Sequence, residues 1–303
     1  MRRCTMIIDI HVHCASSRHP KLCRPNGTRY PTPEELLRMM DDAGIDKAVV
    51  MAGVSPEVRC TLVPPEEVLR ICQIHEDRLI PFCNMDPRFI SNDIHADFSR
   101  LLEAYMEMGC KGIGEFMPNL HFDHPLCMNF FHYVEEAGLP LTFHMAPQEG
   151  GYYGLVDEVG LPRLERVLMA FPNLILLGHS QPFWAEIGSN LIEKGHRIPY
   201  PKGPVVPGRL VELMRMYPSL MGDLSAGSGH GALHRDLAFG LDFMEEFQDR
   251  LLWGTDIANI PQELPIVDFF QRLQDEKLLS QEAYKKITWM NANRLLRLGL
   301  QEL

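Results

Sequence analysis

The sequence has no C-x-x-C pair among its eight cysteines, which argues against a zinc ribbon or a dithiol redox site. No apolar run is long enough to cross a lipid bilayer, so we expect no membrane partner. The apolar segment that starts at Met6 is also too short for the core of a secretion signal. These absences predict a cytoplasmic protein whose cysteines stay reduced.

Positive charge is also scarce. The chain has 29 Lys and Arg residues against 40 Asp and Glu residues, which gives a formal net charge of -11 at pH 7. Because binding to nucleic acid needs clustered Lys and Arg to neutralise phosphates, this balance disfavours a nucleic-acid partner. We expect a small-molecule substrate instead, and the sequence leaves open whether the chain forms a homo-oligomer.

No low-complexity segment and no Ser/Gly-rich linker divides the chain, which predicts one domain over residues 1–303. Short apolar runs typical of buried strands recur along it, and helical patterns follow them. Eight such runs occur, at Ile7–Ile10, Lys47–Met51, Leu79–Asn84, Cys110–Phe116, Leu139–His144, Leu174–His179, Leu220–Leu224 and Leu251–Asp256.

The first helix has clear boundary signals: Thr32 as N-cap, Pro33 in the first turn, Glu35 completing a capping box, and Gly44 as the stop. The other predicted helices span Glu66–His75, Asp93–Met108, Pro125–Ala137, Pro162–Phe171, Pro207–Tyr217, Ala232–Gln248 and Glu282–Leu298.

Eight strand-and-helix units in 303 residues fit an α/β fold, the (β/α)₈ TIM barrel, whose strands are parallel and buried on both faces. The alternative is an open doubly wound sheet, which usually carries a glycine-rich phosphate loop after its first strand. Residues 14–24 contain no glycine, so we favour the barrel.

Two histidines end the first strand, in the stretch "IIDIHVH". Because side chains alternate along a strand, we expect His11 and His13 to share a face with Asp9. The intervening apolar residues Ile8, Ile10 and Val12 are then predicted to share the opposite, core face.

Polar residues end other strands in the same way: Glu115 the fourth, His144 the fifth, His179 the sixth and Asp256 the eighth. A TIM barrel carries its functional groups at the C-terminal ends of the strands, so these side chains converge on one rim. Imidazole and carboxylate are ligands that Zn²⁺ accepts. A lone histidine is more often a surface or hydrogen-bonded residue, but the joint placement predicts a centre with one or two divalent metal ions, preferably zinc.

These motifs resemble the amidohydrolase superfamily, in which "IIDIHVH" at strand one, histidines after strands five and six, and "GTD" at strand eight recur. "GLPLTFH" and the closing "NANRLLRL" are similar to the amidohydrolase-related branch that includes the aminocarboxymuconate-semialdehyde decarboxylase type. The resemblance spans nearly the whole chain. It implies that His11, His13, His144 and Asp256 bind metal, with His179 as a ligand or a catalytic base.

Glu115 departs from a common pattern of that superfamily, a carbamylated lysine at strand four that bridges two metals. Lys111 lies nearer the opposite end of this strand, and "GIGEF" resembles the TatD-like deoxyribonucleases, where a glutamate takes that place. Three roles stay open for Glu115: a bridge between two metals, a ligand to one, or a hydrogen-bond partner of a ligand.

A bound metal activates water at neutral pH, which suits hydrolysis of an amide, lactone or ester. Asp256 would accept the proton of that water, and His179, if it is not a ligand, would polarise the substrate carbonyl. With a different substrate pose the same centre can release CO₂. A decarboxylase of a small unsaturated or aromatic carboxylic acid is therefore the alternative.

The long loop "CASSRHPKLCRPNGTRYPT" after His13 carries four basic residues and no acid. We expect Arg24 and Arg29 to bind an anionic, carboxylate-bearing substrate, with Arg59 after strand two as a further candidate. The alternative is a solvated loop whose charges contribute little. Asp223, after strand seven, is expected to orient a ligand histidine.

Three other functions share part of this pattern. A TatD-like nuclease would use the same ligands, but the acidic charge balance argues against it. A PHP-type phosphoesterase also opens with D-x-H-x-H, yet "DKAVVMAGV" lacks the further histidine expected there. A non-catalytic barrel with a structural metal or none predicts loss of the fold, not of turnover alone, when His11 is replaced.

Overall fold

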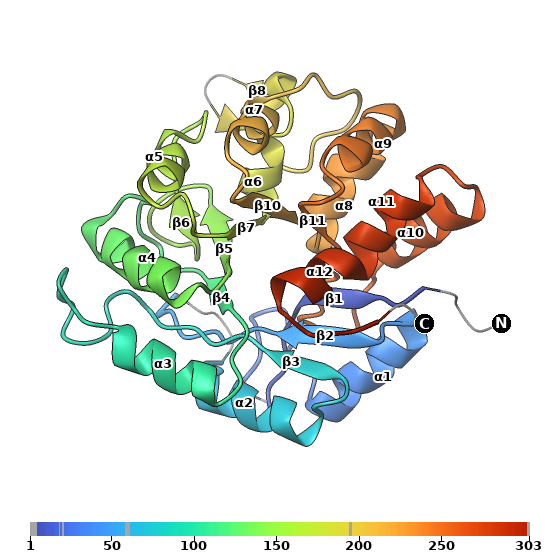
Figure 1. Ribbon diagram of the computed structural model, residues 1–303. Coiled ribbons are helices and arrows are strands. Elements are labelled where there is room, and N and C mark those ends of the chain that lie inside the picture. The colour runs from blue at the N-terminus through green and yellow to red at the C-terminus, as the bar shows by residue number, and fades with distance from the viewer. Residues whose placement is uncertain (1–4, 18, 20, 58–60, 194–195, 302–303) are drawn as a thin grey trace.

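Short parallel strands form the centre of the molecule, and helices surround them (Figure 1). The computed structural model describes residues 5–17, 19, 21–57, 61–193 and 196–301. Within this part, eight central strands match the eight apolar runs of the sequence: β1 (Ile8–Val12), β2 (Lys47–Val50), β3 (Leu79–Pro81), β4 (Ile113–Phe116), β5 (Leu141–Ala146), β7 (Leu176–His179), β10 (Leu220–Asp223) and β11 (Leu251–Leu252).

The strands pair in chain order within two parallel sheets, β1-β2-β3 and β4-β5-β7-β10-β11. Backbone hydrogen bonds join the sheets at both edges. Between β3 and β4, Gly114 N donates to Cys83 O at 2.9 Å. Between β11 and β1, Ile10 N donates to Trp253 O at 3.0 Å. The strands therefore follow one another around a ring, which confirms the predicted TIM barrel.

Helices follow the strands along the chain. They are α1 (Pro33–Ala43), α2 (Pro65–Ile74), α3 (Ser99–Glu107), α4 (Pro125–Ala137), α5 (Pro162–Ala170), α7 (Arg209–Met216), α9 (Leu237–Glu246), α10 (Pro265–Asp275), α11 (Gln281–Lys285) and α12 (Asn291–Leu295). Of these, α10, α11 and α12 come after the last strand. The described helices are all too short or too polar to span a bilayer.

Smaller elements lie in the connections at the C-terminal ends of the strands. They are β6 (Leu155–Val156), which pairs with β5, the helices α6 (Gln181–Ala185) and α8 (Ala226–His234), a 3₁₀ turn at Ser189–Leu191, and the hairpin of β8 (Ile192–Glu193) with β9 (His196–Arg197). The sequence did not predict strands β6, β8 and β9 or helices α6 and α10.

Three predicted helices are wrong in extent. The helix predicted at Asp93–Met108 begins only at Ser99, as α3, because the Asp93 and Asp97 side chains accept the backbone N–H groups of His95 and Ser99 in local turns.

The helix predicted at Ala232–Gln248 is split into α8 and α9, because Asp236 leaves the helical conformation and its side chain accepts the Phe239 N–H as an N-cap. The helix predicted at Glu282–Leu298 is divided by a π-helical segment at Lys286–Met290. In both places the apolar spacing continues through a local break.

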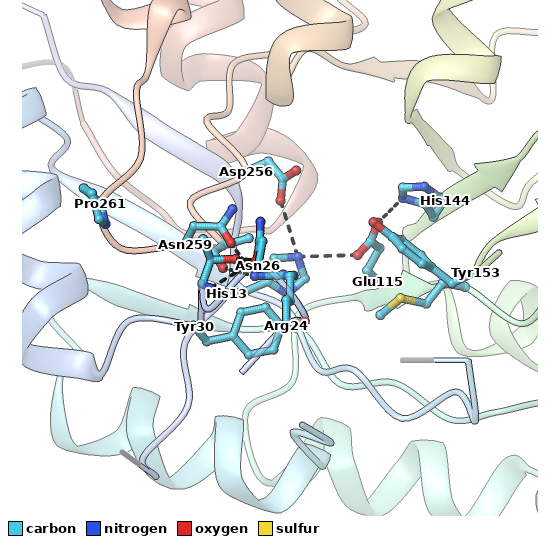
Figure 2. A pocket seen from close by; sticks show the side chains of 13 residues that line it. His13, Arg24, Asn26, Tyr30, Glu115, His144, Tyr153, Asp256, Asn259 and Pro261 are labelled. Atoms are coloured by element: carbon cyan, nitrogen blue, oxygen red, sulfur yellow. Dashed lines mark hydrogen bonds and ion pairs between the residues drawn. The ribbon is translucent and has the colours of Figure 1, made fainter. Parts of the chain in front are cut away.

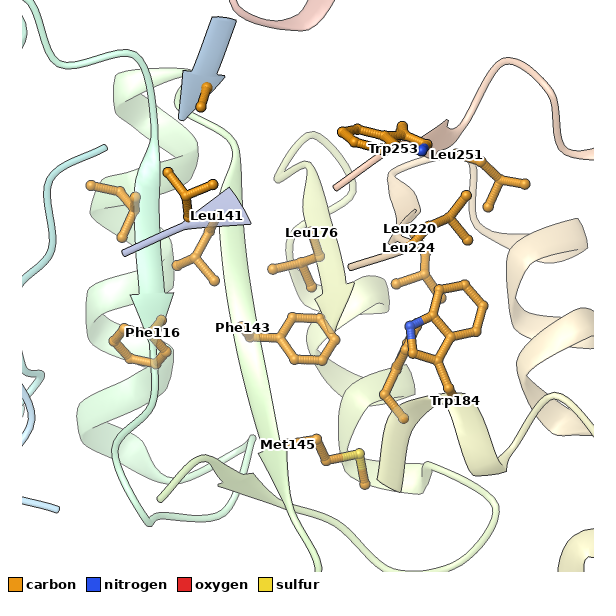
Figure 3. Packing of buried hydrophobic residues seen from close by; sticks show 14 of the residues in the cluster. Phe116, Leu141, Phe143, Met145, Leu176, Trp184, Leu220, Leu224, Leu251 and Trp253 are labelled. Atoms are coloured by element: carbon orange, nitrogen blue, oxygen red, sulfur yellow. The ribbon is translucent and has the colours of Figure 1, made fainter. Parts of the chain in front are cut away.

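Apolar side chains lie in two layers. The outer layer packs between strands and helices, where Phe116, Leu141, Phe143 and Leu176 belong to one buried cluster (Figure 3). The inner layer fills the barrel below the polar rim, with Ile8, Ile10, Val49, Met51, Ile80, Phe82, Leu177, Met221, Leu252 and Trp289. Burial of this surface stabilises the barrel that positions the rim.

Candidate metal centre

A bulge in β1 turns His11 toward the centre of the barrel. Ile10 and His11 together lie opposite a single residue of β2, because the register shifts between Asp9 and Val12. Ile10 packs in the inner layer and Val12 in the outer one, so the predicted simple alternation along this strand is wrong. Bulges commonly redirect side chains beside active sites.

A second bulge, in β4, does the same for Glu115. Gly114 and Glu115 lie opposite Thr142 alone, because the register shifts between Ile113 and Phe116. An added Cβ on Gly114 would lie 2.8 Å from the Sδ of Met51 and 3.1 Å from the Cβ of Thr142, so a larger residue would displace these side chains. The bulge brings the Glu115 carboxylate to the same rim as the β1 histidines.

His11 and His13 meet at their ring nitrogens, with Nε2 atoms 3.1 Å apart. His13 Nε2 also lies 3.4 Å from Glu115 Oε2 and 3.6 Å from Asp256 Oδ1, contacts drawn in Figure 2. Two atoms on one tetrahedral zinc ion, with bonds of about 2.0–2.2 Å, lie about 3.3–3.6 Å apart. The donor atoms of His11, His13 and Glu115 lie within 4.8 Å of one another, so these three residues could share a divalent cation, and Asp256 lies beside them.

His144 and His179 lie on the other side of Glu115. His144 Nδ1 is 2.6 Å from Glu115 Oε1, and His179 Nε2 is 3.8 Å from the same oxygen. Donor atoms of these three residues lie within 4.8 Å of one another, which makes them a second group that could hold an ion. The two oxygens of Glu115 thus face two different groups of donors.

Most of these side chains are deeply buried. The His11, His13, Glu115 and His179 side chains are at most 6% exposed, whereas the Asp256 side chain is 26% exposed. Ionisable groups packed together away from water are costly unless ion pairs, hydrogen bonds or a cation compensate them. The burial is therefore consistent with a metal centre that opens to solvent on the Asp256 side.

Asp223 holds His11 from behind. Its Oδ2 lies 2.6 Å from His11 Nδ1, and both side chains are fully buried. Ser225 holds His179 in a similar way, with its Oγ 2.9 Å from His179 Nδ1. Such partners fix the ring orientation and the tautomer of a ligand histidine, and they leave Nε2 facing the centre.

Without a bound cation, the burial and the charges of the site shift several pKa values strongly. Burial alone would lower the pKa of His11, but the Asp223 carboxylate outweighs it and raises that pKa to about 10. Burial, reinforced by the nearby His11, lowers the pKa of His179 to about 3. Burial raises the pKa of Asp256 to about 7. The site therefore contains a neutral imidazole beside a carboxyl group that titrates near neutrality.

A pocket of about 370 Å³ opens above this centre (Figure 2). Its lining includes His13, Glu115, His144 and Asp256 from the centre, together with Arg24 from the long loop. A ligand in this pocket would touch the candidate metal ligands directly, as expected for a substrate site.

Arg24 is a lining residue of this pocket. Its Nη1 donates to Ala258 O at 2.8 Å and to Asn259 Oδ1, and its guanidinium lies 5.0 Å from the centre of the Tyr30 ring. Within the described part of the chain, its Nε and Nη2 make no hydrogen bond. These contacts hold the cation at the mouth and leave donors for a ligand.

Arg29 is placed differently from the expectation. Its Nη1 and Nη2 lie 2.8 and 2.9 Å from the two oxygens of Glu35, and Nη1 also donates to Tyr30 O. It does not line the pocket, so we assign it to holding the loop against α1. The remaining candidate, Arg59, lies outside the described residues.

Sequence reasoning missed the aromatic walls of the pocket. The Tyr30 ring stacks against His13 with centroids 5.3 Å apart, and the Tyr153 ring lies 4.4 Å from His144. Gly154 lets the chain pass there, since an added Cβ would lie 2.7 Å from His144 Cδ2. Tyr30 belongs to the loop already singled out, but nothing in its spacing marks it as a pocket residue.

Solved structures share this fold. An uncharacterized TIM-barrel protein from Bordetella bronchiseptica superposes with a TM-score of 0.63 at 16% identity, covering 96% of this chain and 98% of that one. A second similar structure is 5-carboxyvanillate decarboxylase from Novosphingobium aromaticivorans, complexed with manganese and 4-hydroxy-3-methoxy-5-nitrobenzoic acid. It superposes with a TM-score of 0.62 at 16% identity, covering 97% of this chain and 96% of that one. A probable 2-pyrone-4,6-dicarboxylic acid hydrolase from Acinetobacter baumannii, with citric acid bound, superposes with a TM-score of 0.57 at 14% identity. The superposition covers 96% of this chain and 99% of that one.

At these identities the structural similarity establishes the fold alone. No curated protein sequence matches the chain. The amidohydrolase family model, in contrast, matches residues 8–298, from the first strand to the last helix. The protein is therefore an enzyme of the amidohydrolase family.

Proposed function

We propose that His11, His13, Glu115, His144, His179 and Asp256 bind divalent metal at this centre. The 3.1 Å approach of the two β1 imidazoles carries this proposal. Asp223 accepts the Nδ1–H of His11, which directs the Nε2 of that ring to the centre. A bound cation would take the place of the Nε2 proton that the metal-free ring holds at neutral pH. Four imidazoles and two carboxylates favour zinc, although a related decarboxylase structure contains manganese.

If the centre holds two ions, Glu115 would hold both of them, since its Oε2 faces His13 and its Oε1 faces His144. Elemental analysis of the purified protein then finds two equivalents of metal per chain. Replacement of Glu115 by Gln, which keeps the size and removes the charge, lowers this to one equivalent or less. A single equivalent in both proteins would leave Glu115 as a ligand to one ion or a hydrogen-bond partner.

A bound divalent ion lowers the pKa of a coordinated water from about 15.7 to about 7 and polarises substrate oxygens. Asp256 is the group placed to move protons. It lies at the open edge of the centre, with its side chain 26% exposed, where its carboxylate can accept a proton and return it. His179 is buried and neutral, which suits a ligand or a hydrogen-bonding group and not a general acid.

The reaction proposed is hydrolysis of an amide, lactone or ester in a small molecule that carries a carboxylate. Arg24 would bind that carboxylate at the mouth of the pocket, because guanidinium and carboxylate match in shape and charge. The test is a panel of carboxylated lactones, amides and esters, assayed for acid release with the metal-loaded enzyme. Hydrolysis of at least one compound, lost in Asp256→Asn, is the expected result.

Decarboxylation is the second candidate, and the aromatic walls favour it. Tyr30 and Tyr153 flank the pocket and could hold a flat ring between them. The related decarboxylase that binds a substituted benzoic acid supports the same substrate class. Assays of CO₂ release over hydroxylated benzoic acids separate the two reactions: CO₂ without any hydrolysis in the first panel would overturn the primary proposal.

A further inference from the structure

A second, smaller pocket of about 210 Å³ lies between α6, α8 and the loop around residue 200. Figure 1 shows the two helices on the same side of the barrel. The lining includes Lys202, His230, His234 and Arg235 and contains no Asp or Glu. In a chain with a net charge of -11, Lys202 and Arg235 give this pocket a local positive charge.

Arg235 is poorly compensated in this position. Its Nε and Nη2 atoms are buried and have no hydrogen-bond partner within the part of the chain that the structure describes. In the described structure, the adjacent Asp236 carboxylate forms no ion pair with Arg235. Its Oδ2 accepts the Val205 N–H at 2.9 Å and its Oδ1 accepts the Phe239 N–H at 3.3 Å. Buried guanidinium groups are normally paired, so this arrangement calls for an anion.

Ser228 provides a second, independent sign of a ligand. Its side chain is 6% exposed, its Oγ has no hydrogen-bond partner among the described residues, and it lines the same pocket. A serine hydroxyl can donate to an oxyanion beside a guanidinium. His230 adds a neutral ring, since burial lowers its pKa to about 4.

The pocket adjoins the metal centre. Ser225, three residues before Ser228, forms a hydrogen bond with His179. The start of α8 therefore contributes one serine to the metal centre and one to this pocket. Gln181, two residues after His179, also lines this pocket.

We propose that this pocket binds the oxyanion of a carboxylate or phosphate group through Arg235, Ser228 and Lys202. Arginine forms paired hydrogen bonds to such groups, and the exposed Lys202 adds charge at the entrance. Two sources share this chemistry: a free inorganic anion, or a second acidic group of the substrate. The second source rests on the proposed function, whereas binding of a free anion does not.

The test is calorimetric titration of purified protein with inorganic phosphate at constant ionic strength. We expect saturable binding to the wild type, and binding weakened about tenfold or more in Arg235→Gln, which loses a charge-assisted hydrogen bond. Arg38→Gln is the matched control, because Arg38 is exposed on α1 across the barrel. Arg24→Gln separates this pocket from the substrate pocket and is expected to retain the phosphate affinity of the wild type.

Equal affinity in the wild type and Arg235→Gln, or no saturable binding at all, would overturn the proposal. Should Arg235→Gln fail to fold, Lys202→Gln gives the same readout from an exposed position, with a smaller loss of affinity. To separate the sources, phosphate is titrated with and without a substrate found in the panels. Competition indicates the substrate's second acid, and independent binding indicates a free anion; neither result depends on turnover by the variants.

Discussion

The contact between Asp223 and His11 is a charge-assisted hydrogen bond between two fully buried groups. Replacing Asp223 by Asn keeps the shape but removes the charge that holds His11 in orientation. We expect the metal affinity to fall about 10–100-fold, as for other partners of metal-binding histidines. Competition with a chromophoric chelator measures it. Asp42→Asn, at an exposed position of α1, is the control and is expected to bind metal like the wild type.

Arg24 and Arg29 belong to one loop but have different surroundings. Arg24→Gln is expected to raise KM for a carboxylated substrate about 10–100-fold with little change in kcat, because a charged hydrogen bond is lost in both ground and transition states. Arg29→Gln is expected to leave KM unchanged, since Arg29 bonds to Glu35. Steady-state kinetics on both variants decides, and equal KM values for Arg24→Gln and the wild type would exclude Arg24 from substrate binding.

At this scale the sequence predicted the polar residues that end strands, because parallel strands in a barrel bring their ends to one rim. It also predicted that Asp223 would bond to a histidine. It could not distinguish Arg24 from Arg29, since the ion pair with Glu35 depends on how the loop folds back on α1. Tyr30 and Tyr153 escaped prediction because a ring contact with a histidine leaves no periodic signal in the sequence.

The two bulges show that the pairing of neighbouring strands determines which way a side chain points. His11 and Glu115 both sit where two residues face one on the neighbouring strand. A strict alternation in β1 would align Val12 with Ile10, and the structure separates them into different layers. A single sequence lacks this information, because register is a property of two strands. Helix breaks at Asp236 and at Lys286–Met290 were missed for a similar reason, since apolar spacing persists across them.

The turn from β7 into α6 depends on close packing between Gly178 and Phe183, which can be tested by mutation. Gly178 precedes His179, and an added Cβ would lie 2.1 Å from Phe183 Cζ. We expect Gly178→Ala to lower the free energy of unfolding by roughly 1–3 kcal/mol through overpacking. Urea denaturation measures it. Combining it with Phe183→Leu, which frees space, should cost less than the sum of the two single changes.

Gly231→Ala is the matched control for that experiment. Gly231 lies within α8, and an added Cβ would have no neighbour within 4 Å among the described residues. Alanine is the better helix former by about 0.8–1.0 kcal/mol, so this variant is expected to be as stable as the wild type or more stable. Similar destabilisation of both alanine variants would mean that Phe183 does not explain the first.

For the whole molecule, metal removal tests whether the rim contributes to stability. Ligand binding to the folded state adds roughly 2.7 kcal/mol when the free metal is at 100 times its dissociation constant. We therefore expect chelation to lower Tm by several degrees and to abolish activity, and added zinc or manganese to restore both. Scanning calorimetry checks the first effect. An unchanged Tm together with full activity after complete metal removal would contradict the proposed centre.

The alternation of apolar runs and helical patterns was sufficient to predict the barrel, because each pattern appears in chain order and the strands pair in the same order. The loops at the C-terminal ends of the strands were not predictable in the same way. Their short elements, such as α6 and the β8–β9 hairpin, are held by tertiary contacts more than by a repeating pattern.

The closure of the ring has a consequence for synthesis of the chain. Asp256 N donates to His11 O at 2.9 Å and His13 N to Ile257 O at 2.7 Å, so the first strand made finds this neighbour only in the last. At about 5–20 residues per second, a nascent chain carries one exposed edge of β1 for roughly 10–50 s. Ribosome-bound chains stalled before residue 251 should therefore lack metal affinity and depend on chaperones that shield this edge.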